Sequence, residues 1–359
     1  MTTRGETLPP TGLGIGRAAG FRARPLVLIV VGLVALIVAL VLGVGLGTVA
    51  VAPADTVAIL AHRLFGLGTP TWSAASEAIV IDLRLPRVLT SMVVGMGLAV
   101  AGVTFQGLLR NPLADPYVLG TASGAALGAA IAVLIPVRAV ILEFGLLHGL
   151  AFVGALASVY AVYRLSRIGG LAPMTSLLLT GYAVGALLAA GLAMAMYMSG
   201  AALRQIFNYL LGGFETASWG RLAGATPIIV LASILILIRA RSLNGLLLGE
   251  ETAAHLGIDV RRERAILLAL ASLVTAAAVA ISGLIGFVGL VVPHVIRLLV
   301  GPSARLVLPL SALAGAGLLA YADLAARMLG EIPVGVVTAV IGAPFFLFVL
   351  RRSQAGYEL

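Results

Sequence analysis

The side chains that enzymes use for covalent chemistry are sparse in this sequence. It contains no Cys, which excludes thiol nucleophiles, iron–sulfur clusters and Cys-ligated zinc. It also contains no Lys, since all 23 basic residues are Arg, and this excludes a Walker A phosphate loop and a Schiff-base enzyme. The four histidines are scattered without an HExxH zinc motif, and none is placed to activate Ser123. The sequence therefore predicts no catalytic residue, no metal site and no cofactor.

Acidic residues inside apolar segments commonly mark ion pathways. Asp323 is the only acid inside a predicted membrane span, near the end of that span, whereas Asp82, Glu143, Glu215 and Glu331 fall at or beyond span ends. An ion-coupled secondary transporter is expected to keep a carboxylate near the middle of the membrane. Asp323 lies near the end of its span and not at the middle, which counts against an ion-coupled carrier. That carrier is kept as the alternative function.

The composition indicates that the chain consists mainly of membrane-spanning helices. Of 359 residues, 61% are hydrophobic, a further 44 are Gly, and only 10% are charged, whereas soluble domains carry about 25% charged residues. The apolar runs are unbroken rather than alternating, which indicates helices and not the strands of an outer-membrane barrel. The net charge of +9 could suggest nucleic acid, but in so apolar a chain it favours Arg-rich cytoplasmic loops.

We expect an all-α polytopic membrane protein with about ten spans. A Pro opens several of them, at the first helical position where no hydrogen bond is lost, and we expect Asp115 to cap the third span at Pro116. On that third span Gly120, Gly124 and Gly128 predict close helix packing. The predicted spans are 26–52, 88–108, 116–135, 145–164, 174–198, 222–239, 265–282, 287–300, 306–325 and 333–350.

The arginine distribution predicts the orientation of these spans. With the N-terminus in the cytoplasm, the inner segments hold 16 of the 23 basic residues and the outer segments hold 7. This bias follows the positive-inside rule, and an even number of spans puts the C-terminus inside as well. The expected organisation is a cytoplasmic tail over 1–25, a single permease domain over 26–352 and a second cytoplasmic tail over 353–359.

Two polar features stand out against this pattern. The inner loop 244–264 mixes apolar and charged residues, which predicts one or two short amphipathic helices, and Glu250 and Glu251 favour a protein partner over an anionic lipid surface. On the outside, Arg84, Arg87 and Arg327 run against the positive-inside bias. They could snorkel at the membrane interface or form an electrostatic dock for an acidic partner.

Four long strings in the sequence resemble the FecCD-type permeases, the membrane subunits of bacterial ABC importers for iron–siderophores, haem and cobalamin. The first string covers 84–128 and includes QGLLRNPLADPYVLG at 106–120. The others are GEETAAHLGIDV at 249–260, SGLIGFVGLVVPHVIR at 282–297 and EIPVGVVTAVIGAPFF at 331–346. The resemblance covers roughly 55–352, and its strings are long and ordered.

The resemblance implies a type II ABC importer permease fold with ten helices per subunit. It also implies a homodimer or paired dimer around a central pathway, two cytoplasmic ABC ATPase subunits below and an extracytoplasmic substrate-binding protein above. The chain itself would then be no enzyme, and it would lie in a bacterial or archaeal cytoplasmic membrane.

By residue, the resemblance implies four sets of sites. They are a binding-protein dock at Arg84, Arg87 and Arg327; a cytoplasmic gate at Asn111, Leu113, Thr175 and Ser176; an ATPase-coupling segment within 244–260, at Gly249, Glu250, Glu251, Ala253, Leu256 and Gly257; and a pathway wall on span 174–198 that includes Gly181 and Gly185. Nothing in the sequence distinguishes a siderophore, haem or cobalamin as the cargo.

Overall fold

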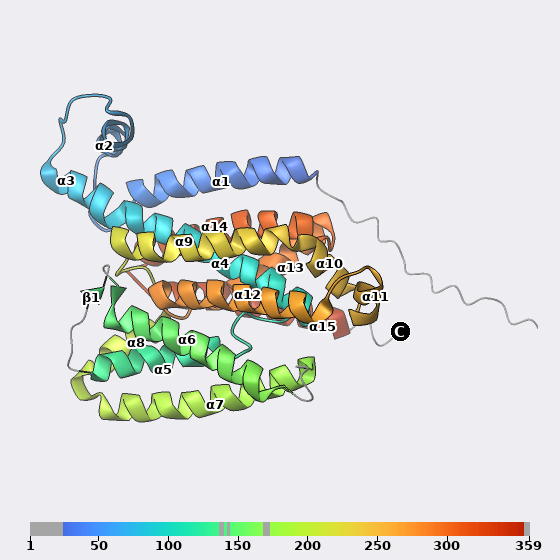
Figure 1. Cartoon of the computed structure of the whole chain (residues 1–359). Coiled ribbons are helices and arrows are strands. Elements are labelled where there is room, and N and C mark those ends of the chain that lie inside the picture. The colour runs from blue at the N-terminus through green and yellow to red at the C-terminus, as the bar shows by residue number, and fades with distance from the viewer. Residues whose placement is uncertain (1–23, 136–139, 142–143, 168–172, 355–359) are drawn as a thin grey trace, which may run out of the picture.

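The computed structural model describes residues 24–135, 140–141, 144–167 and 173–354. In these residues the chain is a helical bundle in which every predicted span coincides with a helix (Figure 1). Eight helices are long and apolar enough to cross a membrane, and two apolar helices, Thr121–Leu134 and Val288–Val300, are shorter. The all-α fold is thus confirmed; the only strands in the described residues are the two-residue β1 (Val140–Ile141) and β2 (Phe144–Gly145), paired antiparallel.

The elements follow one another in a simple order. The helices are α1 (Pro25–Gly45), α2 (Pro53–Phe65), α3 (Ala74–Ala78), α4 (Leu85–Leu108), α5 (Thr121–Leu134), α6 (Leu146–Leu165), α7 (Met174–Met198), α8 (Leu203–Leu211), α9 (Trp219–Ile238), α10 (Ala240–Leu247), α11 (Glu250–His255), α12 (Val260–Ser282), α13 (Val288–Val300), α14 (Ala304–Met328) and α15 (Val334–Gln354). A π-helical stretch, Ile79–Arg84, joins α3 to α4, and the short 3-10 helix Gly200–Ala202 precedes α8.

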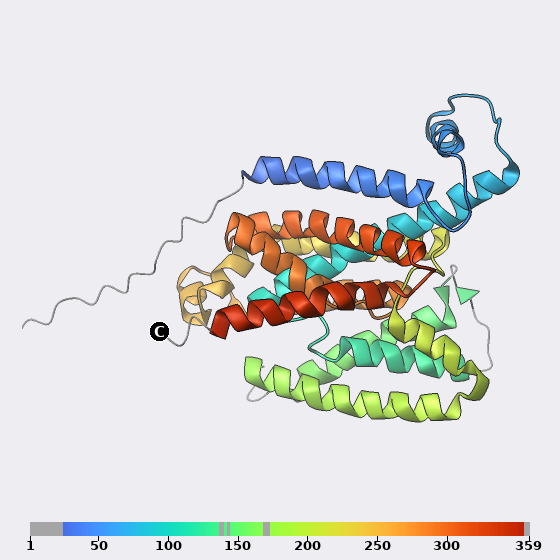
Figure 2. The same ribbon diagram turned by 180° about the vertical axis from the view of Figure 1, so that it is seen from behind.

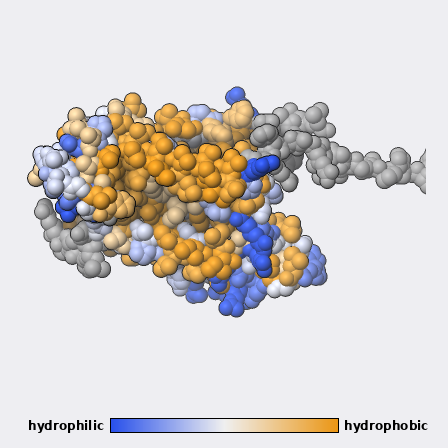
Figure 3. All heavy atoms as spheres, turned by 90° about the horizontal axis from the view of Figure 1, so that it is seen from above, coloured by the Kyte–Doolittle hydropathy of each residue, from blue (hydrophilic) through white to orange (hydrophobic). Residues whose placement is uncertain are grey.

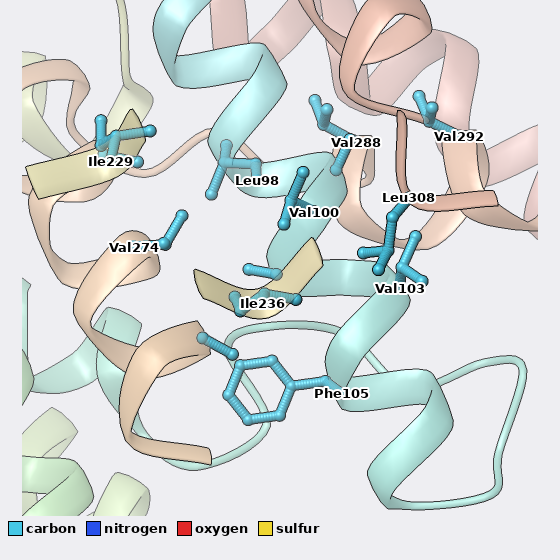
Figure 4. Close-up of a cluster of buried hydrophobic side chains, with 14 of the residues drawn as sticks. Leu98, Val100, Val103, Phe105, Ile229, Ile236, Val274, Val288, Val292 and Leu308 are labelled. Carbon is cyan, nitrogen blue, oxygen red and sulfur yellow. The ribbon is translucent and has the colours of Figure 1, made fainter. Parts of the chain in front are cut away.

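The centre of the bundle is α4. Every residue from Gly97 to Leu108 is buried, as expected for a helix that is apolar on all sides. Figure 4 shows Leu98, Val100, Val103 and Phe105 of α4 among side chains from α9, α12, α13 and α14. In Figures 1 and 2 a second layer, made of α5, α6, α7 and α8, lies on the side of α12 that faces away from α9 and α14.

Close helix contacts in this bundle depend on glycine. A Cβ at Gly102 would lie 1.9 Å from the carbonyl oxygen of Gly289 in α13, and one at Gly95 would lie 2.1 Å from that of Gly315 in α14. The same holds for Gly124 and Gly128 against α6, which confirms packing for that pair. Gly120 differs from the prediction because it precedes α5 with φ +76°.

The helix boundaries require two corrections. The third span begins at Thr121 and not at Pro116, because Asp115 Oδ1 accepts the N–H of Tyr117 at 2.8 Å and forms a turn instead of a helix cap. The second span is longer than predicted, since helical structure is continuous from Ala74 to Leu108. The π-helical turn lies just before Pro86, a residue that cannot donate a backbone hydrogen bond.

Three long helices are largely exposed on the single chain: α1, α7 and α15. Only 11% of the apolar window of α7 is buried, and Tyr182 on it is 81% exposed. In Figure 3 hydrophobic residues form a band across the face that carries α1, and hydrophilic residues gather toward the ends of that band. Such a band suits contact with lipid.

Candidate functional site

The three arginines that the sequence predicts to lie outside are held by backbone carbonyls and by acidic side chains of the chain itself. Arg84, in the π-helical stretch, is buried and donates to the carbonyl oxygens of Val44 at 3.1 Å and Gly45 at 3.0 Å, and also to that of Val49. These carbonyls lie at the end of α1 and just beyond it, where a helix leaves backbone acceptors without intrahelical partners. Arg84 therefore fixes the end of the first helix against α4.

Arg87 and Arg327 share Asp323, a fully buried acid of α14. Arg87 Nε lies 2.8 Å from Asp323 Oδ1, and Arg327 Nε lies 3.1 Å from Asp323 Oδ2. Asp323 is fully buried and Arg327 is 4% exposed. Arg327 also donates to the carbonyl oxygen of Leu46 at 3.1 Å, so it reaches the end of α1 as Arg84 does. Asp323 is thus a counter-ion to two arginines.

The network has one exposed side. Arg87 Nη1 donates to Glu331 Oε2 at 3.0 Å, and the side chain of Glu331 is 38% exposed while that of Arg87 is 13% exposed. Glu331 follows Gly330 in the turn between α14 and α15, and both residues have positive φ, +61° for Glu331 and +95° for Gly330. A non-glycine residue in that region is strained, so the turn holds this carboxylate at a cost.

The predicted gate residues lie at the ends of α4 and α7. Asn111 and Leu113 share the 109–120 loop that follows α4, where Asn111 Oδ1 accepts the N–H of Leu113 at 2.9 Å. Ser176 donates to the carbonyl oxygen of Ser166 at 3.0 Å, which ties the start of α7 to the end of α6. Burial raises the pKa of Asp115 in the same loop to about 6, although its bond from Tyr117 acts in the other direction.

Thr175 lines a cavity of about 440 Å³ that also involves the predicted coupling segment. The cavity lies between the end of α4, the start of α7 and the start of α11. Its other lining residues are Leu109, Arg110, Pro173, Met174, Glu250 and Arg264. Thr175 of the predicted gate and Glu250 of the predicted coupling segment therefore border the same cavity.

The segment 244–260 folds as predicted into short helices, α10 and α11, and its residues divide into a buried and an exposed set. Ala253 is fully buried in the chain, whereas Leu256 is 62% exposed and Glu251 and Gly257 are exposed. Gly249 precedes α11 with φ +114°, a conformation that favours glycine. Ala253 thus supports the segment from within, contrary to the expectation that its side chain forms a contact surface.

The two glycines of the predicted pathway wall face into the chain. Gly181 is buried, and a Cβ there would lie 2.7 Å from the carbonyl oxygen of Val118. A Cβ at Gly185 would lie 3.8 Å from Ser123 Oγ. The exposed side of α7 carries Leu179, Tyr182 and Leu187 instead. Gly181 therefore packs α7 onto the chain's own 116–120 turn, and a pathway wall on α7 stays a prediction.

Sequence reasoning missed three residues that complete these clusters: Glu331, Arg110 and Arg264. Glu331 joins the arginine network, while Arg110 and Arg264 both approach Glu250. Glu331 lies within one of the strings that carried the family resemblance, and Arg110 directly precedes the predicted gate. Pairing between residues so far apart in the sequence has no local signal.

Comparisons with known proteins agree with this geometry. The model of the FecCD transport family matches residues 35–352. The chain is 44% identical over 303 residues to the cobalamin import system permease protein BtuC of Halobacterium salinarum, covering 84% of this chain and 80% of that protein. It is 43% identical over 282 residues to the hemin transport system permease protein HmuU of Yersinia pestis, covering 77% and 84% respectively.

A further relative and one solved structure extend the comparison. The Fe(3+)-citrate import system permease protein YfmD of Bacillus subtilis is 38% identical over 291 residues, which cover 79% of this chain and 84% of that protein. A metal-chelate type ABC transporter solved in an inward-facing conformation superposes with a TM-score of 0.78 at 30% identity, covering 92% of this chain and all of that one.

Proposed function

Because this chain belongs to the FecCD transport family, we propose that it is the membrane permease of an ABC importer that brings cobalamin or an iron chelate, such as haem or a siderophore, into the cytoplasm. ATP hydrolysis would take place on a separate subunit, since the chain carries no Lys and hence no phosphate loop. The observation that supports this most strongly is the family match over 35–352, joined to the bundle shared with a metal-chelate type ABC transporter. No observation favours the ion-coupled alternative.

Reconstitution in liposomes tests this proposal. The purified chain is incorporated with and without an ABC ATPase and a substrate-binding protein from the same organism, and uptake of labelled cobalamin, hemin and ferric citrate is followed. We expect accumulation of at least one cargo only with the ATPase and internal ATP, and we expect an ionophore to leave it unchanged. Accumulation by the chain alone that collapses with the ion gradient would establish the ion-coupled alternative instead.

We propose the same membrane arrangement and partners that the sequence predicts. Both termini would lie in the bacterial or archaeal cytoplasm, which places the Arg87 network outside and α11 inside. The exposed apolar sides of α7 and α15 would meet lipid or a second copy of the chain in a homodimer. Exposed Glu251 and Leu256 are the residues of the 244–260 segment that we propose to contact the ATPase.

We propose that only Arg87, of the three predicted docking arginines, contacts the binding protein. Arg84 and Arg327 are buried and bound to backbone carbonyls, so reversing their charge would disrupt the chain before it tested any interface. Arg87 is the accessible member, and its exposed partner is Glu331. A carboxylate on an incoming binding protein would therefore compete with Glu331 for the same guanidinium group.

We expect Glu331→Gln to tighten docking of the binding protein by up to about five-fold. The variant removes the competing charge, and partly exposed ion pairs contribute at most about 1 kcal/mol. The gain should be larger at low salt, because such contacts act mainly on the association rate. Binding is measured by surface plasmon resonance on the reconstituted transporter at two salt concentrations.

Glu215→Gln is the matched control for this variant, because it removes an equally negative side chain from an exposed position in the loop between α8 and α9. It should change docking less than Glu331→Gln does. Equal effects of both variants would mean that only net charge matters and would refute competition at Arg87.

A further inference from the structure

One carboxylate joins three separate parts of the chain on the face that carries α11. Glu250 is the first residue of α11, and its Oε1 lies 2.6 Å from Nη1 of Arg264 in α12. The same oxygen lies 3.5 Å from Nη2 of Arg110, which begins the connection from α4 to α5. The loop that holds Asn111 and Leu113 is therefore linked to α11 through a single side chain.

The backbone on both sides of this contact is unusual. Arg110 has φ +47°, one of three positive φ values at non-glycine residues in the described chain. Gly249, directly before Glu250, has φ +114°, and a Cβ there would lie 3.9 Å from Nη1 of Arg110. A positive φ at a non-glycine residue is strained, and at Arg110 it lies directly beside the ion cluster.

The cluster borders open space that a moving helix could change. Glu250, Arg110 and Arg264 all line the cavity of about 440 Å³ beside Thr175. A displacement of α11 would carry the Glu250 carboxylate with it and so pull on Arg110 in this cavity. Without the carboxylate, two like charges would remain on opposite sides of the same space.

We infer that Glu250 is a positioning residue that transmits movement of α11 to the 109–120 loop, and not a contact of the ATPase. This inference rests on the proposed function, which assigns the coupling role to the 244–260 segment and the gate to Asn111 and Leu113. Neighbouring Glu251 is exposed and has no ion pair among the described residues. It therefore lacks the link to Arg110 and Arg264 that Glu250 has.

Thiol labelling of the full chain tests the inference without any partner. Because the natural sequence has no Cys, Leu113→Cys introduces the only thiol, and its reaction with an uncharged maleimide in nanodiscs reports on access to the loop. We expect Glu250→Gln to speed labelling about two- to five-fold, the range that an exposed ion pair supports. Glu251→Gln should leave the rate unchanged.

A double-mutant cycle tests whether Glu250 acts on the loop through Arg110. Arg110→Gln should also speed labelling, and combining it with Glu250→Gln should add little, because both changes break the same pair. Equal rates in Glu250→Gln and wild type, or equal effects of Glu250→Gln and Glu251→Gln, would overturn the inference. Additive effects of Arg110→Gln and Glu250→Gln would overturn it too.

Co-purification with the ATPase separates this inference from the proposed function. Glu250→Gln should retain the ATPase, and loss of the ATPase with an unchanged labelling rate would make Glu250 a direct contact and refute transmission. The labelling assay uses the chain alone, so its result stands whether or not reconstituted wild-type chain accumulates cobalamin, hemin or ferric citrate with ATP.

Discussion

Replacing Asp323 with Ala should destabilise the folded chain by about 3–5 kcal/mol, the largest loss that we expect from any single charge. Asp323 is fully buried between Arg87 at 2.8 Å and Arg327 at 3.1 Å. Without it, Arg327 would be a buried charge whose nearest ionic partner is gone, and Arg87 would retain only the partly exposed Glu331. Breaking a buried pair costs far more than the pair contributes, because desolvation of the remaining charge is not offset.

Thermal unfolding in detergent measures this loss, with Asp323→Ala, Asp323→Asn and wild type compared at one heating rate. Asp323→Asn keeps the volume and a hydrogen-bond acceptor but not the charge, so its midpoint should lie between the other two. The control is Glu77→Gln, which breaks a pair with Arg63 whose side chain is 59% exposed, and it should lower the midpoint far less than Asp323→Ala does. Similar midpoints for Asp323→Ala and Glu77→Gln would refute the counter-ion role.

Gly102→Ala should destabilise the chain by about 1–3 kcal/mol or more, the usual range for overpacking. The added Cβ would lie 1.9 Å from the carbonyl oxygen of Gly289, and the neighbouring backbone cannot rotate away as a side chain can. The direction of the stability change shows whether the close contact exists. Without an opposing contact, Ala in a helix interior is more favourable than Gly by roughly 0.5–1 kcal/mol, so the variant would be stabilised.

Gly149→Ala in α6 provides the opposite case, because a Cβ at Gly149 would meet nothing within 4 Å. It should leave stability unchanged or raise it. The two variants are compared by the same thermal assay, together with the fraction of protein that elutes as a single species after extraction. A Gly102→Ala chain as stable as Gly149→Ala would show that α4 and α13 are not held at the distance that the structure gives.

Some elements were predictable because their signals are local. The bounds of α7 match the predicted 174–198, since Pro173 directly precedes an unbroken apolar run. The short helices of the 244–264 loop followed from its mixture of apolar and charged residues. The predicted start of α5 at Pro116 is wrong, because Pro116 lies in a turn and Gly120, with φ +76°, directly precedes the helix.

The contacts of the candidate sites were not predictable in the same way. The sequence placed Arg84, Arg87 and Arg327 together near the outer end of the bundle, but their partners are set by tertiary packing. Arg87 and Asp323 are 236 positions apart, so no pattern along the chain reports their distance. Burial of Gly181 and Ala253 was missed for a related reason, since small residues suit a surface and a tight helix contact equally well.

The contacts of α1 bear on how the chain is assembled during synthesis. Tyr321 of α14 donates to the carbonyl oxygen of Ala35 at 2.9 Å across 286 positions, and Arg327 reaches Leu46 across 281. Because α1 is synthesised before α14, these two bonds can close only after α14 has been made. The contacts from Arg84 to the carbonyls at the end of α1 need only the chain up to α4, so they can close before α14 is made. Long-range closure of this kind slows folding, and it exposes the apolar flanks of α1 and α4 to lipid for most of translation.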